Sequence, residues 1–115
     1  MTKLDIHVGG TFSDTRRRVL NAVARAKAGA LVSEDHVTFA SWEALASVMT
    51  TKRFELLRHL HGHPETTVAA LARSLKRDYK RVHEDVEVLS GAGLIDRSDD
   101  GLRAEYDEIR TQIAL

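Results

Sequence analysis

The stretch from Thr66 to Ala92 constrains the fold of this chain more than any other part of the sequence. Apolar residues recur there at helical spacing in two runs, which the polar tripeptide Lys-Arg-Asp at 76–78 separates. A helix of about nine residues, a turn of about three and a second helix with a polar start are the proportions of a helix-turn-helix. The apolar positions are Val68, Leu71, Ala72, Leu75, Val82, Val86 and Leu89.

A helix-turn-helix places the N-terminal end of its second helix in the major groove of DNA. In this chain that end is rich in side chains that can reach phosphates or base edges. Lys76 and Arg77, in the turn, are better suited to phosphates than to bases. We therefore expect DNA binding through Thr66, Lys76, Arg77, Tyr79, Lys80, Arg81 and Glu84.

The sequence leaves the roles of four of these residues open. Tyr79 can stack on a sugar or touch a thymine methyl group, or it can pack half-buried on the preceding helix. Lys80 and Arg81 are adjacent and point about 100° apart, so one is expected to read bases while the other holds a phosphate. Glu84 can accept a hydrogen bond from a cytosine amino group, or it can pair with Lys80 one turn earlier.

The charge distribution favours the same interpretation. The 17 basic and 17 acidic residues cancel over the whole chain. Residues 52–81, however, carry eight basic and three acidic side chains, whereas residues 82–115 carry three basic and nine acidic ones. A charged run is often only a solvated helix face, but this basic block coincides with the predicted helix-turn-helix, as an electrostatic footprint on DNA would.

A further helix is predicted just before the motif. Thr50 and Thr51 can cap a helix over residues 52–61, which Gly62-His63-Pro64 ends. Thr66 or Thr67 can cap the next helix.

A β-hairpin is predicted after the motif. Residues 94–97 and 102–106 form short extended segments around the turn 98–101, which contains Asp-Gly. Three helices followed by such a hairpin are the pattern of a winged helix-turn-helix, which we predict over residues 49–106. The hairpin, or wing, adds Arg97 and Arg103 as candidate phosphate contacts.

Residues 1–48 are predicted to form a strand-helix-strand extension. Residues 3–8 alternate like a strand, a helix is expected from Ser13 or Asp14 to Lys27, and residues 36–39 suit a second strand. Ser41 can then cap a short helix.

Residues 107–115 suit a strand or a helix. A strand is favoured because the three extended segments of the chain could then share one sheet. The expected fold class is thus α+β, mainly α, with a winged helix-turn-helix as its centre.

Four segments carry a resemblance to a known family: HVTFASWEAL, KRFELLRHL, RDYKRVHEDVEVLSGAGLI and YDEIR. Across roughly residues 36–110 the chain resembles small prokaryotic winged-helix proteins described as MarR-like predicted transcriptional regulators. The resemblance implies sequence-specific binding to double-stranded DNA as a homodimer. Many members look like antitoxins encoded beside a small toxin, which implies autorepression and a cognate toxin as partner.

A homodimer is also expected from the small size of the chain and from segments that a winged helix does not need. Two recognition helices spaced about 34 Å apart would read a palindrome. The residues expected to share an apolar interface are Leu4, Ile6, Val19, Val23, Trp42 and Ile113.

Other classes of function find little support. With no cysteine, disulfides and thiolate metal sites are excluded. No apolar run approaches the roughly 20 residues of a membrane span, and the N-terminus lacks the apolar stretch of a signal peptide, so a cytoplasmic location is expected. No catalytic or cofactor motif is present, and we expect neither enzymatic activity nor a cofactor.

Two alternatives bear on the predicted sites. Metal binding by His59, His61 and His63 is disfavoured because side chains two residues apart point to opposite sides of a helix. The competing interpretation of the whole chain is a winged-helix module that binds another protein and no DNA. The composition is ordinary for one compact domain.

Overall fold

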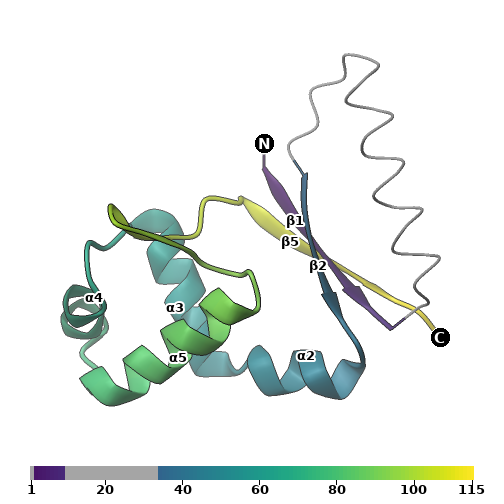
Figure 1. Ribbon diagram of the computed structural model, residues 1–115, viewed down its shortest axis with the longest axis horizontal. Helices are drawn as coiled ribbons and strands as arrows, with labels where there is room; N and C mark the ends of the chain where they lie inside the picture. The colour runs from purple at the N-terminus through teal and green to yellow at the C-terminus, as the bar shows by residue number, and fades with distance from the viewer. Residues whose placement is uncertain (1, 10–33) are drawn as a thin grey trace, which may run out of the picture. The chain divides into compact units, whose positions relative to one another are not determined.

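The computed structural model describes residues 2–9 and 34–115. The predicted helix over residues 14–27, including Val19 and Val23, lies outside the described residues. In the described ranges the protein is of the α+β class, with four helices and five strands (Figure 1).

The chain forms two compact units rather than the single one that its composition predicts. Residues 1–44 and 107–115 make one unit, and residues 45–106 make the other. The single-domain expectation is wrong because segments from both ends of the chain pair in one sheet, while the middle has its own apolar core. The second unit corresponds closely to the predicted segment 49–106.

The first unit contains a three-stranded parallel sheet (Figure 1). Strand β1 (Lys3–Val8) lies in the centre, with β2 (Glu34–Phe39) on one side and β5 (Glu108–Ile113) on the other. The prediction that these three segments share a sheet is confirmed, and β2 begins two residues earlier than expected. The ambiguous C-terminal segment is therefore a strand.

One face of β1 is apolar and fully covered. Leu4 and Ile6 are each 1% exposed, and Val8 is 3% exposed. The prediction that Leu4 and Ile6 contribute to a dimer interface is wrong, because their own chain already buries them. Trp42 and Ile113, in contrast, are 56% and 46% exposed.

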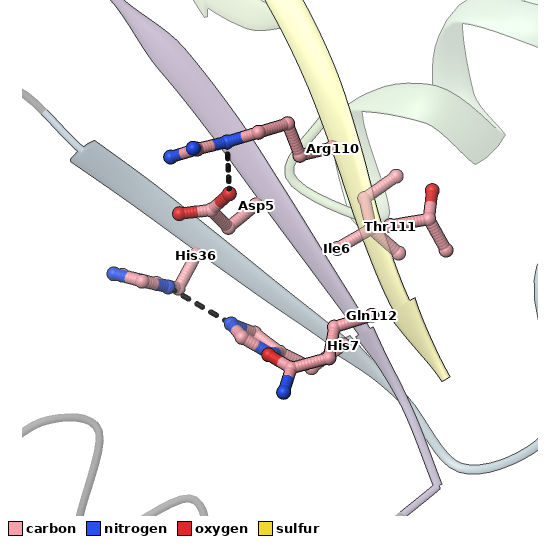
Figure 2. A pocket seen from close by; sticks show the side chains of 7 residues that line it. All are labelled: Asp5, Ile6, His7, His36, Arg110, Thr111 and Gln112. Carbon is pink, nitrogen blue, oxygen red and sulfur yellow. Dashed lines mark hydrogen bonds and ion pairs between the residues drawn. The ribbon is translucent and has the colours of Figure 1, made fainter. Parts of the chain in front are cut away.

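The other face of the sheet is polar. The Arg110 Nε atom donates to Asp5 at 3.1 Å, and His7 Nε2 lies 3.0 Å from His36 Nδ1 (Figure 2). These side chains border a shallow hollow of roughly 510 Å³. Cross-strand pairs of this kind stabilise the register between neighbouring strands.

The second unit contains three helices and a hairpin, preceded by a short helix that begins in the first unit. Hydroxyl and carboxylate caps start its helices. Thr50 Oγ1 accepts from the Arg53 N–H at 3.3 Å, and Asp78 Oδ2 accepts from the Arg81 N–H at 3.2 Å. Of the two residues predicted as possible caps of the next helix, Thr66 and Thr67, it is Thr67 that caps the helix. The elements are α2 (Trp42–Val48), α3 (Thr51–Gly62), α4 (Val68–Leu75), α5 (Tyr79–Gly91), β3 (Asp96–Ser98) and β4 (Gly101–Arg103).

The predicted apolar positions form the core of this unit. All of them are buried except Leu75, which is only partly covered. Leu94 and Ile95, predicted as the start of a hairpin strand, are core residues instead, because the chain turns back against the helices before β3 begins. The side chains with the least exposure are Leu56, Leu60, Leu71, Val82, Val86, Leu89 and Leu94.

The hairpin strands are shorter than predicted, and the predicted turn over residues 98–101 is confirmed. Ser98 pairs with Gly101, so Asp99 and Asp100 form the connection. The Leu102 N–H donates to the Glu65 carbonyl oxygen at 2.7 Å, which brings the hairpin against the α3–α4 connection. Gly101 has a φ of 129°, and a Cβ atom there would collide with that carbonyl oxygen.

Tyr106 anchors the end of the second unit. Its hydroxyl donates to the Leu94 carbonyl oxygen at 2.7 Å. Burial, and to a lesser extent the negative charge of Asp96, raises the pKa of Tyr106 to about 12. The phenol therefore stays a neutral donor throughout the physiological range.

We expect Gly101→Ala to lower the free energy of unfolding by roughly 2–4 kcal/mol, because the methyl group meets backbone at a φ that alanine rarely adopts. Gly91→Ala is the matched control, since a Cβ at this helical position meets nothing within 4 Å. It should be neutral or stabilising by up to about 1 kcal/mol. Urea denaturation followed by circular dichroism measures both, and equal midpoints would contradict the close approach.

Candidate nucleic-acid interface

The connection between α4 and α5 is a tight left-handed cap. Lys76 adopts φ 56° and ψ 46°, and its N–H donates to the Arg73 carbonyl oxygen at 3.2 Å. The next N–H, of Arg77, donates to the Ala72 carbonyl oxygen at 3.0 Å. Glycine usually occupies the left-handed position of such a cap. The cap ends α4 and directs the chain into α5 three residues later.

A buried carboxylate holds α5 in place. Asp85 is 9% exposed, and two arginines donate to it. Arg53 Nε lies 3.0 Å from Oδ1, and Arg77 Nη2 lies 2.8 Å from Oδ2. Arg53 also donates from Nη1 to the carbonyl oxygens of Ser47 and Val48. This ion-pair cluster of Asp85, Arg53 and Arg77 thus joins α5, the α4–α5 turn and the α2–α3 junction.

The sequence analysis did not identify this cluster. Asp85 falls between Val82 and Leu89 on the buried face of α5, and an acidic residue in an apolar stripe is a signal that a buried partner is required. The sequence does not show that two arginines from different segments supply the charge. Arg77, expected to contact a phosphate, has its guanidinium engaged with Asp85 and only 19% of its side chain exposed.

The outward face of α5 presents ionised side chains. Lys80 and Glu84 lie four residues apart on the side opposite Val82 and Val86, and both are exposed. Arg81 is exposed on the flank. Within residues 34–115 no ion pair joins Glu84 to Lys80, and the Lys80 and Arg81 side chains have no carboxylate partner.

The helix dipole adds to the positive potential at this end of α5. The first turn contains no acidic residue, so Lys80 and Arg81 lie beside the positive end of the helix, next to the Asp78 cap. Cations at this position oppose the dipole and lower helix stability, whereas anions are attracted. A helix start of this kind favours binding of a phosphate or another anion.

A hollow of roughly 600 Å³ lies between the starts of α3 and α5. Its lining combines four cations with three carboxylates: Lys52, Arg77, Lys80 and Arg81 with Asp78, Glu84 and Asp85. Lys52, which is exposed, also lies 3.8 Å from Glu55. Lys52 thus brings a cation of α3 beside Lys80 and Arg81 of α5. We call Lys52, Lys76, Lys80 and Arg81 the basic surface.

Tyr79 and Thr66 are both exposed. Tyr79 is 53% exposed, and its ring centroid lies 5.9 Å from that of His83 on the same helix. About half of this side chain therefore remains accessible. Thr66 precedes the Thr67 cap, at the N-terminal end of α4.

The hairpin arginines have carboxylate partners. Arg97 Nη1 lies 2.5 Å from Glu87 Oε1, and this hydrogen bond and charge lower the pKa of Glu87. Arg103 Nη1 lies 3.5 Å from Glu105 Oε1. Together with the exposed Asp99 of the connection, these acids make the hairpin surface much less positive than the basic surface.

The three histidines at the end of α3 have other contacts. His59 Nε2 lies 3.3 Å from Glu65 Oε1, and His61 Nδ1 lies 2.9 Å from the Ala104 carbonyl oxygen. Among the residues described by the structure, no group of three possible ligands gathers around a metal position. In those same residues, no helix combines the length and apolar character needed to cross a bilayer.

Comparison with known proteins assigns the chain to a family. Residues 48–111 match the family described as HVO_A0114, which is more than half of the chain. The chain belongs to this family. The matched segment contains the three helices α3–α5, the hairpin and the first part of β5. No curated protein and no solved structure matches the chain.

We expect Asp85→Asn to lower the free energy of unfolding by roughly 3–5 kcal/mol, because it leaves two partly buried guanidinium groups without a counter-charge. Glu84→Gln is the matched control on the exposed side of α5, with an expected change within about 0.5 kcal/mol. Thermal denaturation at neutral pH measures both. Equal losses in the two variants would show that the cluster does not stabilise the unit.

We expect Lys76→Gly to raise the free energy of unfolding by roughly 0.5–1 kcal/mol, since glycine adopts a positive φ without the clash of a Cβ atom. Lys80→Gly, at a helical position one turn later, should instead cost about 1 kcal/mol. Denaturant titration distinguishes the two. A loss of stability for Lys76→Gly would contradict the left-handed cap.

Proposed function

We propose that residues 45–106 form a winged helix-turn-helix that binds double-stranded DNA with sequence specificity, and that the protein regulates transcription. The observation that carries this proposal is the pair Lys80 and Arg81, exposed and without carboxylate partners at the start of α5. Their position opposes the helix dipole, so it is unfavourable for the free protein and favourable once phosphates approach. The buried Asp85 cluster orients them.

The contacts divide according to the direction of the side chains. Lys80 and Glu84, on the outward face of α5, are assigned to base edges in the major groove. Lysine donates to guanine O6 and N7, and glutamate accepts from the cytosine amino group, so adjacent G and C bases would suit the pair. Tyr79 is assigned to a neighbouring thymine methyl group or sugar.

The remaining contacts are to the phosphate backbone. Arg81 on the flank of α5, Lys76 in the cap and Lys52 from α3 are assigned to phosphates on either side of the groove. Thr66, at the exposed start of α4, is assigned to a further phosphate. Arg77 is assigned to the support of α5 instead.

The hairpin has a different role from the one expected of a wing. Arg97 and Arg103 are paired with carboxylates, and Asp99 at the tip would repel a phosphate. We therefore assign Arg97 to the attachment of the hairpin to Glu87 of α5. Specificity and affinity then depend mainly on α5 and on the basic surface.

A regulator must recognise a longer stretch of DNA sequence than one recognition helix can contact. Two copies acting as a homodimer would contact two half-sites about 34 Å apart on a palindromic operator. The resemblance to antitoxin-type regulators extends the proposal to repression of the protein's own operon and to a toxin partner encoded beside it. The neighbouring reading frame identifies that partner.

We expect the protein to bind duplex DNA from upstream of its own coding sequence, with a log affinity that falls linearly with log salt concentration. Lys80→Ala and Arg81→Ala should each weaken binding. The one that contacts a phosphate should reduce the salt slope by about one, and the one that reads a base should relax sequence preference. Fluorescence anisotropy over a salt series and selection from random duplexes measure these effects.

Arg58→Ala is the matched control for this experiment. Arg58 is an exposed cation on α3 that lies over the Phe54 ring and does not border the hollow at the start of α5. Its removal should leave the salt slope within experimental error. Equal effects of all three substitutions, or no binding of the dimer at moderate salt, would overturn the proposal in favour of a protein-binding module.

A further inference from the structure

Strand β5 is an edge of the parallel sheet in the described part of the chain. It is exposed along almost its whole length: five of its six residues are exposed, and Ile109 is half-buried. Open edges invite pairing with another strand, and proteins usually protect them with proline, a bulge or a charge. The sequence of β5, EIRTQI, contains no proline, and its register with β1 runs from Glu108 to Ile113 without a bulge. Its charged residues are Glu108 and Arg110.

Both edges of the sheet carry charged residues, but the edges differ on the apolar face of the sheet. At the register position of Leu4, strand β2 has the exposed Asp35, whereas β5 has Ile109. A charge on the apolar face of an edge strand disfavours pairing there, whereas Glu108 and Arg110 of β5 lie on the polar face, opposite Lys3 and Asp5. The β5 edge is therefore the one suited to a partner strand.

A hydrogen bond just after the C-terminal end of β5 shows which of its backbone groups point towards β1. The Ala114 N–H donates to the Val8 carbonyl oxygen at 3.0 Å. Because hydrogen-bonding direction alternates along a strand, the even-numbered residues of β5 bond to β1. The N–H and C=O groups of Ile109, Thr111 and Ile113 therefore point away from the sheet, and their side chains lie on its apolar face.

These three residues are self-complementary about Thr111. In an antiparallel pair with a second β5, Thr111 lies opposite Thr111 of the other copy, and Ile109 lies opposite Ile113. All the outward backbone groups of both strands are then used, in about six hydrogen bonds. Centring the pair on Arg110 instead places two like charges opposite each other. A pair centred on Ile109 or Gln112 would need residues outside Glu108–Ile113 to reach the same number of hydrogen bonds.

We infer that the β5 edge is the homodimer interface of this protein, with a two-fold axis at Thr111 that joins two three-stranded sheets into one. The occupant of the edge is a second copy of the chain, because the register is complementary to itself. This inference rests on the proposed function only in that a palindromic operator requires two copies. It replaces the interface expected from Leu4 and Ile6.

The natural absence of cysteine allows a direct test. Thr111→Cys places two thiols across the axis, where the Cα atoms of a hydrogen-bonded antiparallel pair are about 5.5 Å apart, within the range of a disulfide. Under mild oxidation of the full chain without DNA, we expect most of this variant to run as a covalent dimer. Gln112→Cys is the matched control. Its two copies are offset along the strands, so about tenfold less dimer is expected.

A mixing experiment tests the register itself. Ile109→Cys and Ile113→Cys should each form little disulfide alone, because the identical residues lie about 13 Å apart along the strands. Mixed together, the two variants should form a covalent heterodimer. Thr111→Pro should raise the dissociation constant of the dimer about tenfold or more, while the unit stays folded, because that N–H does not bond to β1.

The outcomes separate this inference from the proposed function. Equal cross-linking of the Thr111→Cys and Gln112→Cys variants would overturn the inference, and so would light scattering that shows a monomer of the unaltered protein at micromolar concentration. Cross-linking at Thr111 without DNA binding would support the β5 interface and reject the regulator. DNA binding by a protein without this cross-link would place the dimer contact elsewhere.

Discussion

The burial of one carboxylate governs the arrangement of the helical unit. Asp85 lies on the face of α5 that packs into the core, where an unpaired charge would be very unfavourable. Two guanidinium groups from different segments neutralise it at 3.0 and 2.8 Å. Because Arg53 also binds the carbonyl oxygens of Ser47 and Val48, the charge requirement of a single residue fixes the α2–α3 junction and the start of α5 together.

The same cluster explains why the basic residues of α3, α5 and the α4–α5 turn are not equivalent. Arg53 and Arg77 belong to the basic block of the sequence, but their charge is directed inward. Lys80 and Arg81 remain outside at the positive end of a helix. In the free protein, Lys80 and Arg81 thus lie in an unfavourable position beside the positive end of α5. The favourable ion pairs of Asp85 lie beneath them. Such a combination suits a surface whose stabilising partner is a polyanion.

The sheet unit combines strands from the two ends of the chain. It pairs residues from the beginning and the end of the sequence, so β5 both completes the sheet and exposes its edge. A parallel sheet of three strands leaves two edges. On the apolar face, opposite Leu4, β2 presents the charged Asp35 whereas β5 presents Ile109. The β5 edge is therefore both part of the unit's own structure and the surface through which we infer that two copies meet.

Local patterns in the sequence were sufficient for the helices and for β1, but not for the bounds of the hairpin strands. Helical periodicity placed α3, α4 and α5, and short polar side chains at Thr50, Asp78 and Ser41 cap helices as such residues do in most proteins. Alternation identified β1, whereas the C-terminal strand was favoured only because three extended segments could share one sheet. The patterns of the helices and of β1 depend on neighbours within a few residues, so they can be recognised without the rest of the chain.

The roles of the charged residues were decided only by the tertiary structure. In the sequence, Arg77 and Arg81 differ little, but folding brings Asp85 to one and solvent to the other. Leu4 and Ile6 likewise suggested an interface until the fold covered them. Charge and hydrophobicity are properties of a residue, whereas pairing and burial depend on what distant segments bring beside it, and no local pattern records that.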